Sequence, residues 1–497
     1  MTFMGNTLTH AQIPQEICRI TETLESAGYE AYLVGGCVRD LVLGKTPKDW
    51  DVATNATPEH IQSLFSKTFY ENSFGTVGVV NENPADPSLS VVEVTPYRTE
   101  GEYSDKRRPD SVMFSTSLED DLKRRDFTIN ALALSVQKGR ALSLVDRFSG
   151  EKDLKNKVIR AVGDPHIRLS EDALRIMRAV RLSAELGFVI EGETLLALST
   201  HRELLSHIAK ERIRDEFIRI IASDRPMEAL ALMRELGILA YVAPELEEGV
   251  GIEQTQTHAY DVWEHLLRTL QHAADKKYSL EIRLAALFHD IGKPKTRRMG
   301  KGTYTFYGHE VVGAKMTEKI LKNLNFPTKT IDHVTKLVRW HMFFSDTETI
   351  TLSAVRRMIA NVRPERIWDL MNVRICDRIG TGRPKENPYR LRKYKAMVEE
   401  ALRDPVSVGM LKIDGGDIMN ILGITPGPMI GLVLNALMEE VLDDPTKNTA
   451  EYLTNRVKTL ATLDTKELKK LAAIGKDKKD RAEEAELNTI RKRHGVQ

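Results

Sequence analysis

Apolar residues recur at helical spacing near the start of the chain and then alternate with polar residues as they do in strands. Four of them lie three or four positions apart, namely Ile13, Ile17, Ile20 and Leu24. This spacing predicts an amphipathic helix that ends at Gly28. Between residues 30 and 98, the runs EAYLV, DWDVA, VGVV and SVVEVTPY predict strands that alternate with short helices. The first part of the chain is therefore expected to be a small mixed α/β unit.

After residue 150, helical periodicity dominates and strand patterns nearly vanish. Prolines interrupt this helical region at Pro244, Pro327, Pro388 and Pro426. We expect an α+β fold, in which a small mixed-sheet head precedes a long all-α body. The expected domains are a head (1–150), a helical neck (151–250), a third domain (251–385), a helical tail (386–465) and a charged C-terminal tail (466–497).

Composition narrows the class of protein. The 497 residues are 41% hydrophobic and 29% charged, as in ordinary globular proteins. Lysine and arginine together number 72 against 71 acidic residues, so the net charge of +1 excludes a chain-wide basic field for binding nucleic acid or membrane. Three distant cysteines form neither a disulfide framework nor a CxxC zinc site, which favours a reducing compartment. Because neither a signal peptide nor a membrane-spanning apolar run is seen, we expect a cytoplasmic protein that does not enter a membrane.

Two carboxylates downstream of a glycine turn are the first candidate chemistry. Asp49 and Asp51 lie two apart in KDWDVAT, a predicted strand, so both side chains would share one face and hold a divalent metal. In LVGGCVRD the chain leaves a strand through Gly35 and Gly36 and enters a helix, which offers N–H groups to phosphate beside Arg39. Either feature alone is common, since an acidic pair can be a solvated surface and such a turn can need glycine only for its conformation.

Two other nucleotide-binding classes are excluded. The segment Gly44-Lys45-Thr46 lacks the first glycine of a P-loop, because position 39 is an arginine. No GxGxxG motif follows a predicted strand, which excludes a dinucleotide-binding dehydrogenase.

An ordered set of motifs between residues 28 and 220 resembles the class II bacterial tRNA nucleotidyltransferase and poly(A) polymerase family. The motifs are GGCVRDLVLGKTPKDWDVAT, GTVGVV, VVEVTPYR, GEYSDKRRPD, DLKRRDFTINALAL and SEDALRIMRAVRLSAELGF. The resemblance implies that Asp49 and Asp51 hold catalytic Mg²⁺ and that Gly35 and Gly36 contact the incoming triphosphate. Joining a 3′-hydroxyl to an α-phosphate requires charge neutralisation of this kind and no covalent protein nucleophile.

Further residues gain candidate roles from the same resemblance. Glu93 resembles a third head carboxylate, with an ion pair to Arg98 at a strand edge as the alternative. In LKRRDFTINALAL, Asp126 precedes a run of helix formers, so it would cap or open a helix. The resemblance implies instead that Arg125 and Asp126 meet the ribose and phosphates of the nucleotide, with Asn130 nearby.

The segment SEDALRIMRAVR predicts one helix that carries Glu171, Asp172, Arg175 and Arg178. Such spacing often means only surface ion pairs. In the family, EDxxR is the nucleotide-reading motif, so Asp172 and Arg175 would hydrogen-bond the base edge. A carboxylate with a guanidinium offers an acceptor and donors to cytosine or to adenine.

The stretch GEYSDKRRPD, residues 101–110, is predicted to be a loop. It resembles the flexible loop of CCA-adding enzymes, which is thought to help the site change from CTP to ATP. No arginine-rich segment typical of poly(A) polymerases follows the metal strand. Addition of CCA is therefore favoured over addition of poly(A).

A second constellation lies in the helical body. In ALFHDIGKP, a histidine and an aspartate stand adjacent within an apolar helix predicted to break at Gly292. With further His and Asp residues they form an ordered set that resembles the HD phosphohydrolase superfamily and suits a divalent transition metal or Mg²⁺. The set is His265, His289, Asp290, His309, His341 and Asp377. The third domain would then be an HD domain, which in some bacterial members is associated with phosphatase and 2′,3′-cyclic phosphodiesterase activity.

These patterns favour an enzyme that adds CCA to the 3′ end of tRNA from CTP and ATP, with an attached HD hydrolase. Two alternatives stay open: a poly(A) polymerase or A-adding enzyme, and a protein that is mainly an HD phosphohydrolase with an RNA-binding head. The sequence predicts no oligomeric state.

Overall fold

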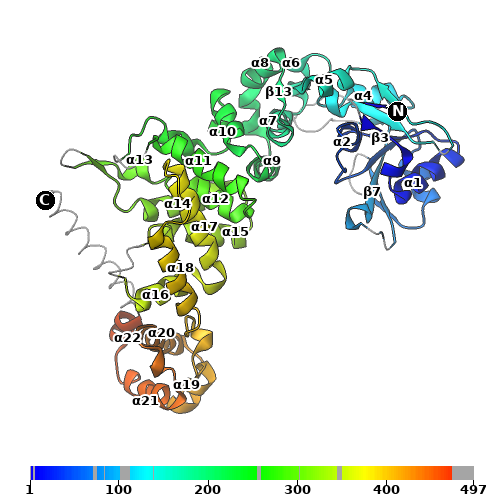
Figure 1. The fold of residues 1–497 in the computed structure, drawn as a ribbon. Coiled ribbons are helices and arrows are strands. Elements are labelled where there is room, and N and C mark those ends of the chain that lie inside the picture. The colour runs from blue at the N-terminus through cyan, green and yellow to red at the C-terminus, as the bar shows by residue number, and fades with distance from the viewer. Residues whose placement is uncertain are drawn as a thin grey trace. The chain divides into compact units, whose positions relative to one another are not determined.

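The computed structural model of the chain divides into two compact units, Met1–Val242 and Ala243–Gln497 (Figure 1). The structure describes residues 2–3, 6–70, 75–82, 84, 86–100, 112–137, 139–254, 259–300, 303–343 and 350–472. The predicted loop at 101–110 and most of the charged C-terminal tail lie outside these residues. In the described part of the chain, no helix has the length and apolar character needed to cross a membrane.

The first unit is built on a mixed seven-stranded sheet with the strand order β11-β10-β3-β4-β7-β6-β5. Strands β4 and β7 run parallel, whereas the other neighbouring pairs run antiparallel. The strands are β3 (Ala31–Val34), β4 (Asp51–Thr54), β5 (Thr68–Tyr70), β6 (Val77–Val80), β7 (Val91–Pro96), β10 (Leu132–Ser135) and β11 (Ser143–Asp146).

Helices and short two-stranded pairs complete this unit. The helices are α1 (Gln15–Ser26), α2 (Gly36–Val42), α3 (Pro58–Leu64), α4 (Leu118–Lys123), α5 (Gly150–Asn156), α6 (Pro165–Glu171), α7 (Leu174–Leu186), α8 (Gly192–His201), α9 (Lys210–Ala222) and α10 (Pro226–Glu235). The pairs are β1 (Thr2–Phe3) with β2 (Asn6–Thr7), β8 (Arg98–Glu100) with β9 (Val112–Phe114), and β12 (Val158–Ile159) with β13 (Val189–Ile190).

Alternation along the strands gives the sheet two different faces. Val52 and Val94 pair across β4 and β7 and are fully buried on the face that α1 and α3 cover. Asp51 and Glu93, one residue earlier on each strand, point to the opposite face because successive side chains alternate. Farther along that face, Ala53 packs into a small core under α4. The acidic pair therefore lies at the open end of a partly covered face.

The second unit is helical. Its helices are α11 (Val262–Asp275), α12 (Leu280–Phe288), α13 (Lys293–Thr296), α14 (His309–Asn323), α15 (Thr328–Trp340), α16 (Leu352–Val362), α17 (Ile367–Gly380), α18 (Tyr389–Ala401), α19 (Gly415–Leu422), α20 (Pro428–Asp443), α21 (Ala450–Leu460) and α22 (Thr465–Ala472). Two short strands, β14 (Arg298–Met299) and β15 (Tyr304–Thr305), form a hairpin. Helices α11 and α17 pack so closely that a Cβ added at Gly380 would collide with Oγ1 of Thr269.

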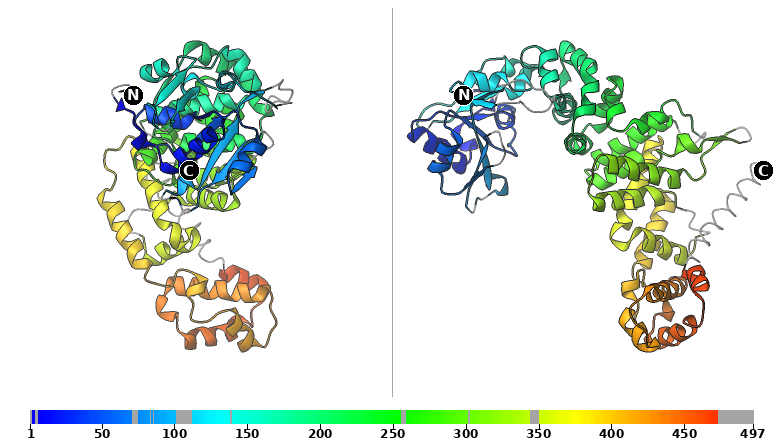
Figure 2. Two further views of the ribbon diagram at one scale, coloured as in Figure 1. Left: turned by 90° about the vertical axis from the view of Figure 1, so that its right-hand side faces the viewer. Right: turned by 180° about the vertical axis from the view of Figure 1, so that it is seen from behind.

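The last four helices of this unit, α19 to α22, surround a hydrophobic core of their own (Figure 2). Arg356 and Arg357 of α16 hold the C-terminal end of α20. Arg356 donates to the carbonyl oxygen of Leu442 at 2.8 Å, and Arg357 pairs with Glu439 at 2.9 Å.

The expected α+β architecture is confirmed, and two predicted elements are wrong. The run after Asn130, predicted as helical, forms β10, because pairing with β3 and β11 outweighs the high helix propensity of its Ala and Leu residues. The helix predicted through Glu171 and Arg178 is interrupted, because Asp172 is extended (φ −130°, ψ 103°). Its Oδ1 accepts from the N–H of Leu174 at 3.0 Å, a local bond that competes with the helix.

Candidate functional sites

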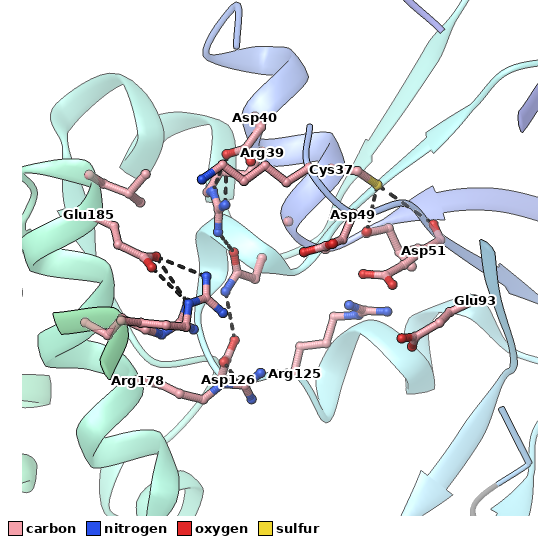
Figure 3. A pocket seen from close by; sticks show the side chains of 18 of the residues that line it. Cys37, Arg39, Asp40, Asp49, Asp51, Glu93, Arg125, Asp126, Arg178 and Glu185 are labelled. Atoms are coloured by element: carbon pink, nitrogen blue, oxygen red, sulfur yellow. Dashed lines mark hydrogen bonds and ion pairs between the residues drawn. The ribbon is translucent and has the colours of Figure 1, made fainter. Parts of the chain in front are cut away.

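A cavity of about 1200 Å³ opens in the first unit, above the carboxylate face of the sheet and between helices of the neck (Figure 3). Most of the residues predicted for the nucleotide site line it: Gly35, Gly36, Arg39, Asp49, Asp51, Glu93, Arg125, Asp126, Asn130, Asp172, Arg175 and Arg178. Glu171 does not line the cavity and acts on it through another residue, as described below.

The carboxylates come together through strand pairing. Asp51 opens β4 and lies directly opposite Glu93 of the parallel strand β7. Asp49 is exposed in the bend before β4, so the prediction that it belongs to the strand is wrong. Figure 3 shows all three side chains at the same end of the cavity. Oxygen ligands in this open arrangement suit Mg²⁺, which prefers carboxylates and retains water.

The glycine turn has a specific conformational reason. Gly35 has φ 73° and ψ −132°, a region that side-chain-bearing residues rarely adopt, and α2 begins directly after it. A Cβ at Gly35 would lie 2.9 Å from Nη1 of Arg125 and 3.6 Å from Oδ2 of Asp51. The missing side chain therefore lets the backbone approach both charged groups.

A polar chain connects this end of the cavity to the neck helix α7. Arg39 donates to Oδ1 of Asn130 at 2.8 Å, and Nδ2 of Asn130 donates to Oδ1 of Asp126 at 3.2 Å. Asp126 in turn pairs with Arg178 at 3.3 Å. Burial would raise the pKa of Asp126, but Arg178 and the hydrogen bonds outweigh it and hold that pKa below its ordinary value. Asp126 therefore stays an ionised acceptor, and it does not cap an α-helix.

Asp172 and Arg175, the two residues of the EDxxR motif that line the cavity, are each bonded to further residues that fix their side chains. Glu171 Oε2 accepts from Arg175 at 2.7 Å and from Arg168 at 2.8 Å. Arg175 also donates to the backbone oxygens of Arg168 and Arg124. Asp172 pairs with Arg212 at 3.1 Å. The interruption between α6 and α7 thus gives the carboxylate and the guanidinium fixed positions that a continuous helix would not provide.

Helix α9 contributes residues that sequence reasoning missed. Arg212 and Arg219 line the cavity. Glu216 is buried between Arg178 and Arg181 of α7, and its Oε2 lies 2.6 Å from Nε of Arg181. The spacing of four and three between residues 212, 216 and 219 is the signal by which the sequence could have indicated that they share one helix face. Cys37 also lines the cavity, but burial raises the pKa of its thiol to about 12, so it remains neutral.

In the second unit, all six residues of the predicted HD set converge into one buried cluster. His265 comes from α11, His309 from α14 and Asp377 from α17, while His341 follows α15 directly. His289 and Asp290 lie in the turn after α12, not within the helix as predicted. Two groups that could each hold a metal ion form and share Asp290: one with His265, His289 and Asp377, the other with His309 and His341.

The two oxygens of Asp290 divide between these groups. Its Oδ2 lies 3.1 Å from Nε2 of His265 and 3.3 Å from Nε2 of His289. Its Oδ1 lies 3.1 Å from Nε2 of His309 and 3.4 Å from Nε2 of His341. Such a carboxylate can bridge two cations.

Three of the histidines present the nitrogen that a metal requires. Nδ1 of His289, His309 and His341 lies 2.7 to 2.9 Å from the backbone oxygen three residues earlier. A carbonyl oxygen only accepts, so Nδ1 carries a proton, which leaves Nε2 as the nitrogen of each ring that could bind a metal. Nε2 of His265 and Nε2 of His289 are 2.9 Å apart, a close approach of two basic nitrogens that a shared cation would relieve. The donor set therefore fits divalent metal.

Charged neighbours keep the carboxylates of the cluster ionised. Burial would raise the pKa of Asp290, but Lys293 and the histidines outweigh it and hold the pKa well below its usual range. Lys293 Nζ lies 2.5 Å from Asp290 Oδ2 and donates to Gln254 at 2.6 Å. Arg374 pairs with Asp377 at 2.6 Å in the same way. Burial lowers the pKa of His341 to about 4, so this imidazole is neutral at neutral pH.

Three family models match the chain. They are the poly(A) polymerase head domain over residues 31–160, the probable RNA- and SrmB-binding site of polymerase A over 187–249, and the HD domain over 262–379. The first matches the sheet and its carboxylates, and the third spans all six residues of the buried cluster. The class is therefore that of nucleotidyltransferases with a poly(A) polymerase head, here followed by an HD domain.

Curated relatives narrow this class. The CCA-adding enzyme of Geobacillus thermodenitrificans is 32% identical over 440 residues, which cover 88% of this chain and 95% of the relative. The CCA-adding enzyme of Lactiplantibacillus plantarum is 31% identical over 89% of this chain and 95% of the relative. A solved structure, the Bacillus stearothermophilus CCA-adding enzyme in complex with CTP, is 30% identical with a TM-score of 0.67 and covers 90% of this chain and 98% of its own. The chain belongs to the family of CCA-adding enzymes, which confirms the resemblance found in the sequence.

Proposed function

We propose that this protein adds CCA to the 3′ end of tRNA, without a template, from CTP and ATP. The observation that carries the proposal is the register of the sheet, which sets Asp51 opposite Glu93 in the same cavity as the EDxxR pair. One end of the cavity thus offers ligands for catalytic cations, and the other offers an acceptor and donors for a base.

The carboxylates Asp49, Asp51 and Glu93 would hold Mg²⁺. Held there, Mg²⁺ would lower the pKa of the acceptor hydroxyl and neutralise charge on the phosphates. The part of the protein is to keep these three oxygen ligands on one side of the cavity, next to the place where the α-phosphate must lie.

The triphosphate would lie along the glycine turn. Gly35 and Gly36 let the backbone approach it, and Arg125, near Gly35 and Asp51, supplies a fixed positive charge. Asp126 accepts a hydrogen bond from the ribose, while Asn130 and Arg39 keep that carboxylate in place from one side and Arg178 from the other.

The base edge would meet Asp172 and Arg175. The carboxylate accepts from the exocyclic amino group that both cytosine and adenine carry, and the guanidinium donates to a ring acceptor. Glu171 positions Arg175 and Arg212 positions Asp172, so the two groups recognise a hydrogen-bonding pattern through side chains that are already ordered.

The buried cluster supports a second activity, the hydrolysis of phosphate esters at RNA 3′ ends, including 2′,3′-cyclic phosphates. His265, His289, Asp290, His309, His341 and Asp377 would hold a divalent transition metal or Mg²⁺. Metal held there would activate water for attack and would neutralise charge on the phosphate. Lys293 and Arg374 keep the two carboxylates anionic and oriented. Removal of a terminal phosphate would restore the hydroxyl that nucleotide addition needs.

This function gives each predicted region a role. We assign residues 1–150 to catalysis, 151–250 to nucleotide recognition, 251–385 to phosphohydrolysis and 386–465 to holding tRNA, with 466–497 as a charged tail. We also propose that the protein works in the cytoplasm, where tRNA, CTP and ATP are found.

The decisive experiment is incubation of purified protein and Mg²⁺ with tRNA that lacks CCA, with CTP alone, ATP alone or both. The proposal requires two C residues with CTP alone and the complete CCA with both nucleotides. Long A tracts from ATP alone would identify a poly(A) polymerase. Phosphate release without any nucleotide addition would identify an HD phosphohydrolase with an RNA-binding head.

A further inference from the structure

We propose that Phe69 forms a stacking platform for the base at the 3′ end of the RNA that accepts the nucleotide. The proposal rests on nucleotidyl transfer as the function of the head. It assigns the acceptor a subsite on the sheet itself, beside the carboxylates and apart from the residues that recognise the incoming nucleotide.

The strand register places Phe69 on the catalytic face. Phe69 of β5 pairs with Gly78 of β6, Gly78 pairs with Glu93 of β7, and Glu93 pairs with Asp51 of β4. Paired residues share a face of the sheet, so these four positions form one row that ends at the carboxylates. Since neighbouring strands lie about 4.8 Å apart, the Cα of Phe69 is roughly 10 Å from that of Glu93.

The ring of Phe69 lies over Gly78. A Cβ added at Gly78 would be 2.5 Å from Cζ and 2.8 Å from Cε1 of the phenyl ring. Because Gly78 has no side chain, the ring rests on the backbone of β6, one strand away from Glu93. Gly78 is buried under the ring, whereas Phe69 itself is 42% exposed.

The chemistry of the transfer favours the 3′-terminal base of the acceptor RNA as the group that stacks on Phe69. The acceptor hydroxyl must reach the α-phosphate at Asp51 and Glu93, so the base on the same ribose must lie within one nucleotide of the carboxylates. An exposed aromatic ring binds such a base by stacking, and stacking tolerates any base because each has a π-face. Tolerance is needed here, since the acceptor of the first addition ends in the 3′ base of the tRNA body, whereas the acceptors of the next two additions end in cytosine.

A purely structural role is the alternative, because aromatic rings that cover glycines also stabilise sheet edges. Tyr70 provides the matched control for this possibility. It is the next residue of β5, is 49% exposed and faces the other side of the sheet, where it hydrogen-bonds to Glu59 of α3. Removal of either ring changes the edge strand, but only Phe69 belongs to the carboxylate row.

The first test measures addition of one C to tRNA lacking CCA, with separate determination of KM for tRNA and for CTP. We expect Phe69→Ala to raise KM for tRNA by about 5- to 150-fold, the range produced by loss of one base–aromatic stack. KM for CTP stays unchanged, Phe69→Trp restores tRNA binding, and Tyr70→Ala resembles the wild type. Gly78→Ala, whose methyl group displaces the ring, should have the same effect as Phe69→Ala.

The second test uses tRNA whose 3′-terminal nucleotide lacks its base. For the wild type, KM should rise on this acceptor by the same factor by which Phe69→Ala raises KM for intact tRNA. For Phe69→Ala, KM should be the same for both acceptors. Independent losses that multiply, or an unchanged KM for tRNA in a folded Phe69→Ala variant, would overturn the platform while wild-type addition still supports the proposed function. Absence of addition by the wild type would overturn the function and the platform together.

Discussion

Glu93 is the residue whose role the sequence leaves most open, as a metal ligand or as a partner of Arg98. Its position opposite Asp51 favours the first role, because two carboxylates on adjacent strands repel each other unless a cation lies between them. Both Glu93 and Arg98 line the cavity, so each is accessible to the reactants.

We therefore expect Glu93→Gln to lower kcat for both C and A addition by about 100-fold or more, which corresponds to about 2.7 kcal/mol of barrier. The amide keeps the size of the side chain and removes the charge that a metal needs. The measurement is single-turnover incorporation across a Mg²⁺ titration. Arg98→Gln is the control, and an equal loss in that variant would identify the ion pair as the role of Glu93.

Gly35 offers a second test at this scale. Gly35→Ala should raise KM for both nucleotides and lower the free energy of unfolding by about 1 to 2 kcal/mol, because its φ of 73° is unfavourable for alanine and its methyl group would meet Arg125. Nucleotide kinetics and thermal denaturation measure the two effects.

Gly28→Ala is the matched variant, because Gly28 also has a positive φ (88°) but no atom within 4 Å of an added Cβ. It should lose stability to a similar extent and keep its affinity for nucleotides. If both variants lose nucleotide affinity equally, backbone strain alone explains the requirement for glycine at position 35.

At the scale of elements, the break between α6 and α7 fixes the positions of Asp172 and Arg175, the pair proposed to recognise the base. The amphipathic pattern predicts one helix there, but the side chain of Asp172 bonds the backbone of Leu174 and leaves its second oxygen to Arg212. Local patterns indicate the helices on either side correctly. These patterns do not show that the side chain of Asp172 competes with the helical hydrogen bonds, or that α9 packs beside it.

Glu171 tests this arrangement from outside the cavity. Glu171→Gln should raise KM for CTP and ATP by about 10-fold, because a charge-assisted hydrogen bond that orients Arg175 is weakened. It should leave KM for tRNA unchanged. Steady-state kinetics with each nucleotide provide the measurement.

Glu228→Gln is the control, because it also removes an ion pair from the first unit. Glu228 pairs with Arg225 at the surface, where both side chains are more than half exposed. Nucleotide constants in this variant should match the wild type, as exposed pairs contribute little. A wild-type KM for the nucleotides in Glu171→Gln would show that Arg175 needs no partner to read the base.

At the scale of the whole molecule, the two sets of proposed metal ligands occupy different units of the chain. The carboxylates of the sheet lie before Val242, and the six residues of the HD cluster lie after Ala243. This division predicts that the two activities can be separated by substitution.

His289→Ala combined with Asp290→Asn should abolish hydrolysis of 2′,3′-cyclic phosphates and leave CCA addition nearly unchanged. The asparagine retains a neutral partner for the buried Lys293, whose charge would otherwise be left alone at a cost of about 3 to 5 kcal/mol. Hydrolysis of a model cyclic nucleotide across Mg²⁺, Mn²⁺ and Ni²⁺ measures the first activity. The metal content of the purified protein should fall in parallel.

The reciprocal variant is Asp51→Asn, which should lose nucleotide addition and keep hydrolysis. Loss of CCA addition in the HD variant, with the fold intact by circular dichroism, would contradict the independence of the sites. No turnover of the wild type with any of the three metals would reduce the HD cluster to a structural role.

The sequence by itself determined the motifs, the order of the HD ligands and the change from a mixed sheet to helices, because these follow from residue type and local periodicity. The tertiary structure alone decided the pairing of Asp51 with Glu93, the row that includes Phe69, the entry of α9 into the cavity and the position of Asp290 between two pairs of histidines. Each of these joins residues far apart in the chain, and strand register and helix packing are fixed by the burial of whole faces. No short segment carries that information.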